Sequence, residues 1–262
     1  MKALPLEQQV IWLTGASTGI GAALTQALAG RCKRLYISAR NEQKLQQLAA
    51  GQKHIIPCPA DVTSEQELQT VAARIEQECG QLDMLITNAG TCEYVDAGAP
   101  DPAMFRRVMD TNFMGTINAI SVALPLLKKS SRAMIAGVSS SVTALAMPRA
   151  QAYGASKAAV THCLQSFAAD LHTHGIDVSV ISPGFVRTPL TDVNDFPMPC
   201  LIEADEAART IIDGLERRQR DIHFPKRFTL TLRLLGLLPE ALRFRISRAM
   251  SRQNNNPRKL SS

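Results

Sequence analysis

The sequence predicts a doubly wound α/β domain, in which helices cover both faces of a parallel sheet. Two observations support this fold class. Short runs of β-branched and apolar residues alternate with longer amphipathic segments through positions 1–216, and strands that alternate with helices form parallel sheets through right-handed crossovers. No linker, repeat or block of like charge interrupts residues 1–225. We therefore expect one domain over residues 1–225 and a tail over residues 226–262.

The predicted elements follow the chain in the order expected for such a fold. Strands are expected over residues 10–14, 34–39, 54–58, 83–88, 133–139 and 176–182. Helices are expected over residues 19–29, 41–50, 64–79, 102–129, 150–174 and 204–217. Ser64 and Glu67 have the spacing of a capping box at the start of the third helix. Residues 222–225 are expected to add a last edge strand.

Composition excludes several classes of protein. The chain has 262 residues, 45% of them hydrophobic and 20% charged, which suffices for a large buried core. Its longest apolar run near the C-terminus, residues 234–238, is far shorter than the roughly 20 residues that cross a bilayer. The N-terminus lacks the apolar core of a secretory signal. The six cysteines include no C-x-x-C pair, so we assign no metal site. From the short apolar run and the N-terminal sequence, we expect a cytoplasmic protein.

A glycine-rich turn follows the first strand directly. In a dinucleotide fold, Gly15 would make the tight turn, Gly19 would let the backbone approach a pyrophosphate, and Gly21 would let the helix pack on the strand. The N–H groups at the start of the helix would then point toward the anion. A plain turn at the end of a strand is the alternative. The pattern favours a Rossmann-type cofactor site that also includes Ser17, Thr18 and Ile20.

The residues after the second strand bear on the choice of cofactor. A dinucleotide fold recognises the adenosine ribose there, where an acidic residue binds the 2′-hydroxyl of NAD and an arginine can pair with the 2′-phosphate of NADP. Ser38 and Arg40 occupy this place, so NADP is the expected cofactor. The alternative is that Arg40 is a solvated residue that opens the next helix.

Further motifs follow the other strands. Asp61-Val62 follows the third strand, Asn88-Ala89-Gly90 the fourth, and the P-G-F-V-R-T segment at 183–188 the sixth. Tyr153 and Lys157 lie one helical turn apart, on one face of a helix, and Ser140 follows the fifth strand, upstream of Tyr153. With the T-G-x-x-x-G-x-G turn, these elements resemble the short-chain dehydrogenase/reductase family, of its single-domain type, which has the same separation between its catalytic Ser and Tyr. One departure is Thr87, where the family usually has another Asn.

The resemblance implies an enzyme that interconverts a carbonyl and an alcohol with a nicotinamide cofactor. It implies that Tyr153 is the acid/base and that Ser140 orients the substrate. Lys157 would lower the pKa of Tyr153 from its usual ~10 and would also bind the nicotinamide ribose. Asn112 would hold a water that connects Lys157 to solvent. Without the resemblance, Asn112 is equally well an ordinary buried polar residue.

The same resemblance assigns the remaining cofactor contacts. Asp61 and Val62 would lie at the adenine, although Asp61 could also be a simple helix-entry residue. The cleft would be lined by Asn88, Ala89 and Gly90. The nicotinamide would meet Pro183, Gly184, Val186 and Thr188, although a Pro-Gly turn can leave any strand.

The C-terminal part of the chain differs in charge from the rest. Residues 217–262 contain 12 Lys and Arg but 2 acids, a net charge of +10, whereas positions 1–216 carry −4. The stretch from Phe228 to Met250 is typical of an amphipathic helix broken at Gly236 and Pro239. Such a helix could pack on the body as a lid or subunit contact, or bind peripherally to the inner face of an anionic membrane. Nucleic acid is not an expected partner, because no reader motif is present.

These observations predict an NADP(H)-dependent oxidoreductase that acts on a small carbonyl or alcohol substrate. Residues 191–203, where the family places its substrate loop, include Phe196, Met198 and Leu201, which favours a lipophilic substrate. The resemblance also implies a homodimer or homotetramer. Two alternatives remain open: a 3-oxoacyl-carrier-protein reductase, and a sensor or scaffold that binds NADP without catalysis.

Overall fold

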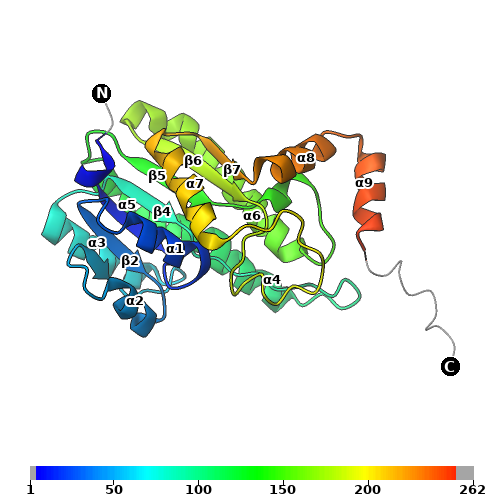
Figure 1. The fold of residues 1–262 in the computed structure, drawn as a ribbon, viewed down its shortest axis with the longest axis horizontal. Coiled ribbons are helices and arrows are strands. Elements are labelled where there is room, and N and C mark those ends of the chain that lie inside the picture. Colours follow the sequence, from blue (N-terminus) through cyan, green and yellow to red (C-terminus); the bar gives the residue numbers. More distant parts are fainter. Residues whose placement is uncertain (1–3, 252–262) are drawn as a thin grey trace.

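The computed structural model describes residues 4–251 and shows a parallel sheet of seven strands in the order β3-β2-β1-β4-β5-β6-β7 (Figure 1). All neighbouring strands pair in parallel. The doubly wound fold class is therefore confirmed. The strands are β1 (Val10–Thr14), β2 (Arg34–Ser38), β3 (Ile55–Pro57), β4 (Met84–Thr87), β5 (Met134–Val138), β6 (Asp177–Pro183) and β7 (Asp221–Phe224).

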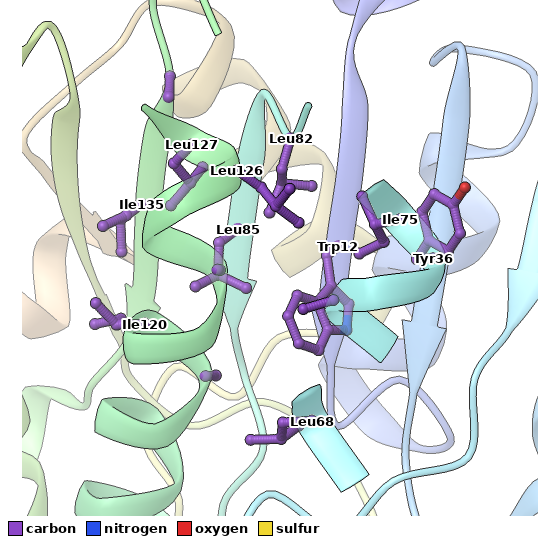
Figure 2. Close-up of a cluster of buried hydrophobic side chains, with 14 of the residues drawn as sticks. Trp12, Tyr36, Leu68, Ile75, Leu82, Leu85, Ile120, Leu126, Leu127 and Ile135 are labelled. Atoms are coloured by element: carbon purple, nitrogen blue, oxygen red, sulfur yellow. The ribbon is translucent and has the colours of Figure 1, made fainter. Parts of the chain in front are cut away.

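Helices bury both faces of this sheet. On one face lie α1 (Gly19–Leu28), α2 (Glu42–Ala49) and α7 (Ala204–Glu216). On the other lie α3 (Glu65–Cys79), α5 (Gly115–Leu127) and α6 (Gln151–Leu171). Side chains of a strand point to alternate faces, so Ile11 and Leu13 enter the first core and Trp12 enters the second. Figure 2 shows Trp12 and Tyr36 of the sheet against Leu68 and Ile75 of α3 in this second core.

The segment expected as one helix over residues 102–129 is helical without a break from residue 102 to residue 127, but it is not α-helical throughout. It consists of α4 (Pro102–Met109), a π-helical turn (Asp110–Met114) and α5. The side chain of Asn112 on this turn bonds to Thr91 and Ser156. A π-helical turn inserts one residue into a helix and often marks a functional position. In this protein the turn contains Asn112, whose hydrogen bonds join it to residues far away in the sequence. The periodicity of the helix does not predict such bonds.

Only one of the two hydrogen bonds of the expected capping box forms. Ser64 accepts a hydrogen bond from the amide of Glu67 at 3.3 Å. The carboxylate of Glu67, however, accepts from the amide of Asp61 at 2.8 Å rather than from that of Ser64. Glu67 therefore holds the backbone of Asp61, a predicted cofactor contact, in the segment between β3 and α3.

The C-terminal segment forms two helices, α8 (Lys226–Gly236) and α9 (Glu240–Ala249), separated where Gly236 and Pro239 were expected to break the helix. Phe228 of α8 packs on Phe185 with ring centroids 5.4 Å apart. Gly236 lies against Ala144, in the 3-10 turn Ser141–Ala144. The tail helices thus contact the segments that directly follow β5 and β6. Residues 252–262 of the predicted tail lie outside the described residues.

Gly236→Ala is expected to destabilise the protein, because the added Cβ would lie 2.2 Å from the carbonyl oxygen of Ala144. Relief of such overpacking requires a backbone shift, which costs about 1–3 kcal/mol. We expect Tm to fall by roughly 2–10 °C, measured by calorimetry. Gly98→Ala is the matched control, since its Cβ would meet only the end of the Asp96 side chain at 3.3 Å. An equal Tm for the two variants would contradict the close packing of α8 on this turn.

Candidate active site

A cavity of about 740 Å³ opens at the carboxyl ends of the strands. Strand β1 lies at its centre, with β2 and β3 on one side and β4, β5 and β6 on the other. Ligands of doubly wound sheets bind at this reversal of strand order. Of the residues predicted from sequence, the cavity is lined by Gly15, Ser17, Thr18, Gly19, Ile20, Arg40, Asp61, Val62, Asn88, Ala89, Gly90, Ser140, Tyr153, Lys157, Pro183, Gly184, Val186 and Thr188.

The glycine turn forms the floor of the cavity between β1 and α1. Gly15 has a φ of +66°, and a Cβ there would lie 2.5 Å from the Cα of Ala89. A Cβ on Gly21 would lie 2.1 Å from the carbonyl oxygen of Gly15. The side-chain amide of Asn88 donates to this same oxygen at 2.9 Å. The turn therefore needs glycine at both positions, and Asn88 ties it to the end of β4.

Three predicted site residues do not line the cavity. Gly21 acts through the packing just described. The hydroxyl of Ser38 is buried and accepts a hydrogen bond from Trp12 Nε1 at 2.9 Å, on the face of the sheet that carries Tyr36. The Ser38 side chain is therefore part of the buried core. Asn112 is also buried, next to the cavity wall.

Arg40 and Asp61 lie at the end of the cavity formed by β2 and β3. Arg40 is exposed and forms no ion pair with any carboxylate of residues 4–251. One oxygen of Asp61 accepts from both the amide and the hydroxyl of Thr63, at 2.9 and 2.8 Å. These bonds form a turn before α3, whose N-cap is Ser64, and Asp61 also lines the cavity.

Tyr153 and Lys157 lie on α6 and meet Ser140 at the end of β5. Lys157 Nζ is 5.9 Å from the centroid of the Tyr153 ring and donates to the carbonyl oxygen of Val138 at 2.8 Å. The Ser140 hydroxyl accepts from the amide of Val142 at 3.2 Å and also bonds to Tyr153. The predicted spacing thus brings a phenol, an ammonium and a hydroxyl to one wall of the cavity.

The electrostatics of this group differ from expectation. Burial raises the pKa of Tyr153 to about 12, although its hydrogen bond with Ser140 acts in the opposite direction. Burial likewise lowers the pKa of Lys157 to about 8. In the protein alone, loss of hydration is the largest cause of both shifts, so the expected fall in the Tyr153 pKa is not found. Both shifts favour a neutral side chain.

Lys157→Met is expected to change how stability depends on pH. The pKa of Lys157 is about 8 in the folded protein, against an ordinary value of 10.5. Between these two pH values, Lys157 binds more protons in the unfolded chain than in the folded chain. This group therefore destabilises the fold below about pH 8, and the penalty is lost as pH rises. We expect the free energy of unfolding of the wild type, minus that of the variant, to rise by up to ~3 kcal/mol across this range in urea titrations. With Lys128→Met, an exposed control, the difference should stay flat.

Asn112 is held beside Lys157 by three hydrogen bonds. Its Oδ1 accepts from the amide of Thr91 at 2.7 Å, and its Nδ2 donates to the carbonyl oxygen of Thr91 and to the hydroxyl of Ser156, both at 2.9 Å. A Cβ on Gly90 would lie 3.2 Å from Lys157 Nζ and 3.3 Å from Asn112 Oδ1. Gly90 therefore leaves the space in which these two side chains approach one another.

The cavity wall also contains residues that the motifs did not indicate. Glu93 and Arg107 form a bidentate ion pair at its rim, with contacts of 3.2 and 2.7 Å. Arg107 and Thr111 are one helical turn apart, which was the available signal for a shared face. The others are Ala39, Asn41, Ala60, Thr91, Val138, Ser139, Pro189, Leu190 and Thr191.

An aromatic cluster joins this cavity wall to the loop after β6. Phe196 contacts the rings of Tyr94 and Phe185, each at 6.0 Å between centroids. Arg149 lies 4.6 Å above the Tyr94 ring and bonds to Asp195 at 3.0 Å. The Tyr94 hydroxyl donates to Asn194. The loop is therefore joined to Tyr94, which lies close enough to Tyr153 to raise its pKa.

Two kinds of feature are absent from residues 4–251. No helix among them is long and apolar enough to cross a membrane. No group of three or more His, Cys, Asp or Glu side chains in this range is placed to hold a metal ion.

Comparison with known proteins places this chain in a family. The short chain dehydrogenase model matches residues 9–196. The chain is 36% identical to L-fucose dehydrogenase of Mus musculus, covering 70% of this chain and 67% of that protein. It is 29% identical to 11-beta-hydroxysteroid dehydrogenase 1A of Arabidopsis thaliana, covering 89% and 73%. It is similar to the solved short chain dehydrogenase of Burkholderia cenocepacia in complex with NADP, at 27% identity and a TM-score of 0.81, covering 93% and 99% of the two chains.

The resemblance drawn from the motifs is thereby confirmed, because the matched region spans the glycine turn, Ser140, Tyr153 and the loop after β6. The chain belongs to the short chain dehydrogenase family and is an oxidoreductase of alcohol and carbonyl groups that uses a nicotinamide cofactor.

Proposed function

We propose that this protein reduces a lipophilic ketone or aldehyde with NADPH, and catalyses the reverse oxidation, with Tyr153 as the acid/base. The observation that carries the proposal is the meeting of Tyr153, Ser140 and Lys157 in the cavity that also contains the glycine turn. Proton transfer and dinucleotide binding can then occur side by side.

The residues of the cavity suit a dinucleotide. The turn at residues 15–21 leaves no room for Cβ atoms at Gly15 and Gly21, and α1 begins there with N–H groups available to an anion. Arg40 supports NADP, because it reaches the cavity without a carboxylate partner among the described residues and can pair with a 2′-phosphate. Bound in this cavity, the nicotinamide would supply or accept the hydride.

The chain's own groups would act on the substrate oxygen. Tyr153 would donate its proton to the carbonyl oxygen as negative charge develops there, and its raised pKa keeps the phenol protonated for this step near neutral pH. Ser140 would donate a second hydrogen bond to the same oxygen and hold the carbonyl in place. Lys157 would bind the ribose and stabilise the tyrosinate that remains. Asn112, which approaches Lys157 in the space that Gly90 leaves, would hold a water that connects Lys157 to solvent.

The aromatic cluster supports a lipophilic substrate. Phe196 contacts both Tyr94 and Phe185, and Tyr94 lies close enough to Tyr153 to raise its pKa. Aromatic rings contribute large apolar contact areas. The names of the two relatives indicate different substrates, a sugar for one and steroids for the other. The cluster favours the second kind of substrate.

A panel of carbonyls and alcohols tests the proposal. Steroidal, retinoid-like and acyl ketones would be compared with sugars, each with NADPH and NADH. We expect turnover of an apolar carbonyl with NADPH; turnover confined to polar sugars would contradict the substrate class. Activity on a carrier-linked 3-oxoacyl group alone would favour the carrier-protein reductase. NADPH binding without any turnover would favour the non-catalytic sensor.

A further inference from the structure

We propose that α8 and α9 form a docking surface for an anionic lipid bilayer. The proposed surface comprises Arg227, Leu230, Leu234 and Leu237 along α8 and its C-terminal end, together with Leu242, Arg243, Phe244 and Arg245, which lie around the exposed helix α9. The inference is independent of the proposed substrate, because it rests on the outward side of two helices that take no part in lining the cavity.

Two leucines of α8 and Leu237, the residue that caps its C-terminus, form one outward row. Leu230, Leu234 and Leu237 follow the i, i+4, i+7 spacing of a single helix face, and 48%, 66% and 82% of their surfaces are exposed. The opposite face of α8 is satisfied, since Thr229 and Leu232 are buried. The outward row therefore has no partner in the described chain, although its helix is firmly placed.

Helix α9 is even less covered. It buries none of its residues, and it touches the body through Ser247, whose hydroxyl donates to the carbonyl oxygen of Ala146 at 2.7 Å. Figure 1 shows α9 standing apart from the sheet, beyond the end of α8. Leu242 and Phe244 are 44% and 63% exposed. Both helices thus present large apolar side chains to solvent.

The charges beside these apolar side chains select the partner. Arg227, Arg243 and Arg245 form no ion pair with any described residue, and Glu240 is the one acid in residues 226–249. Basic amphipathic helices bind anionic bilayers by placing apolar side chains in the acyl boundary and arginines at the phosphates. A second copy of the chain would instead bring arginine against arginine. Helices of 11 and 10 residues are too short to span a bilayer, so they would lie on its surface.

Flotation of the full chain with vesicles tests the proposal. We expect the protein to float with vesicles of phosphatidylcholine and phosphatidylglycerol, and to remain behind with phosphatidylcholine alone or at high salt. The pairs Leu234→Glu/Leu237→Glu and Arg243→Glu/Arg245→Glu should each weaken partition about tenfold or more. The control pair Lys33→Glu/Lys128→Glu makes the same change of charge as the arginine pair, and a larger one than the leucine pair, at exposed sites elsewhere; it should leave partition within about twofold.

A spectroscopic readout reports contact at one residue. The single Trp of the chain, Trp12, is fully buried and bonded to Ser38, so its emission should not respond to vesicles. In Leu237→Trp the new indole should shift to shorter wavelength when anionic vesicles are added. No flotation, or equal losses in the control pair, would overturn the proposal. So would a fall in molar mass of the leucine variant in light scattering, because the face would then join two copies.

Discussion

Tyr153→Phe is expected to lower kcat/KM for carbonyl reduction by about 10³-fold while leaving NADPH binding nearly unchanged. The variant removes the proton that the phenol donates, and general acid catalysis is worth about 10²–10⁴-fold. The ring itself remains, so the packing of α6 beside Lys157 is retained. Steady-state kinetics with NADPH give the first quantity, and the change in NADPH fluorescence on binding gives the second.

Tyr36→Phe is the matched control for this change. Tyr36 lies on β2, where its hydroxyl donates to Glu78 at 2.8 Å, and it does not line the cavity. Loss of that bond should reduce stability by about 1 kcal/mol and leave kcat/KM within about twofold. If Tyr153→Phe retained wild-type turnover, Tyr153 would not be the acid. If it abolished NADPH binding as well, the loss of activity would report a damaged site.

The sequence predicted most of this site because its motifs follow strands. Gly15, Asp61, Asn88, Ser140 and the segment at 183–188 each come after a different strand, and the carboxyl ends of parallel strands meet at one edge of the sheet. Local periodicity located the ends of those strands to within one residue. Residues that follow strands could therefore be brought together without knowledge of side-chain packing.

Features that depend on long-range contacts were not predicted. The π-helical turn at Asn112 accompanies bonds to Thr91 and Ser156, 21 and 44 residues away. The pKa directions of Tyr153 and Lys157 follow from burial, which spacing does not reveal.

The placement of Ser38, by contrast, had an available signal. Residues two apart on a strand share a face, so Ser38 belongs with Tyr36, on the face where its hydroxyl accepts from Trp12. Alternation along β2 would therefore have directed the Ser38 side chain into the core and away from the cavity that Arg40 lines.

Arg40→Glu is expected to reverse the preference between the two nicotinamide cofactors. In the wild type, the guanidinium would pair with the 2′-phosphate of NADP, and a charge-assisted bond of this kind contributes about 1.5–3 kcal/mol. Its loss should lower kcat/KM for NADPH about 10-fold to 100-fold. The new carboxylate would repel the phosphate further and could accept a bond from the 2′-hydroxyl of NADH. The ratio of kcat/KM for NADPH to that for NADH, measured on one substrate, gives the change directly.

Arg34→Glu distinguishes this specific pairing from a general effect of charge. Arg34 begins β2, the strand after which Arg40 lies, and it is absent from the cavity wall. Both variants change the net charge equally, so long-range attraction of the dinucleotide should weaken alike in the two and decline with added salt. The Arg40 variant alone should retain its altered cofactor ratio at high salt, since a direct contact is screened less. An Arg40→Glu enzyme with the wild-type ratio would show that Arg40 is the solvated helix-entry residue of the alternative interpretation, and that NADP recognition must lie with another part of the cavity.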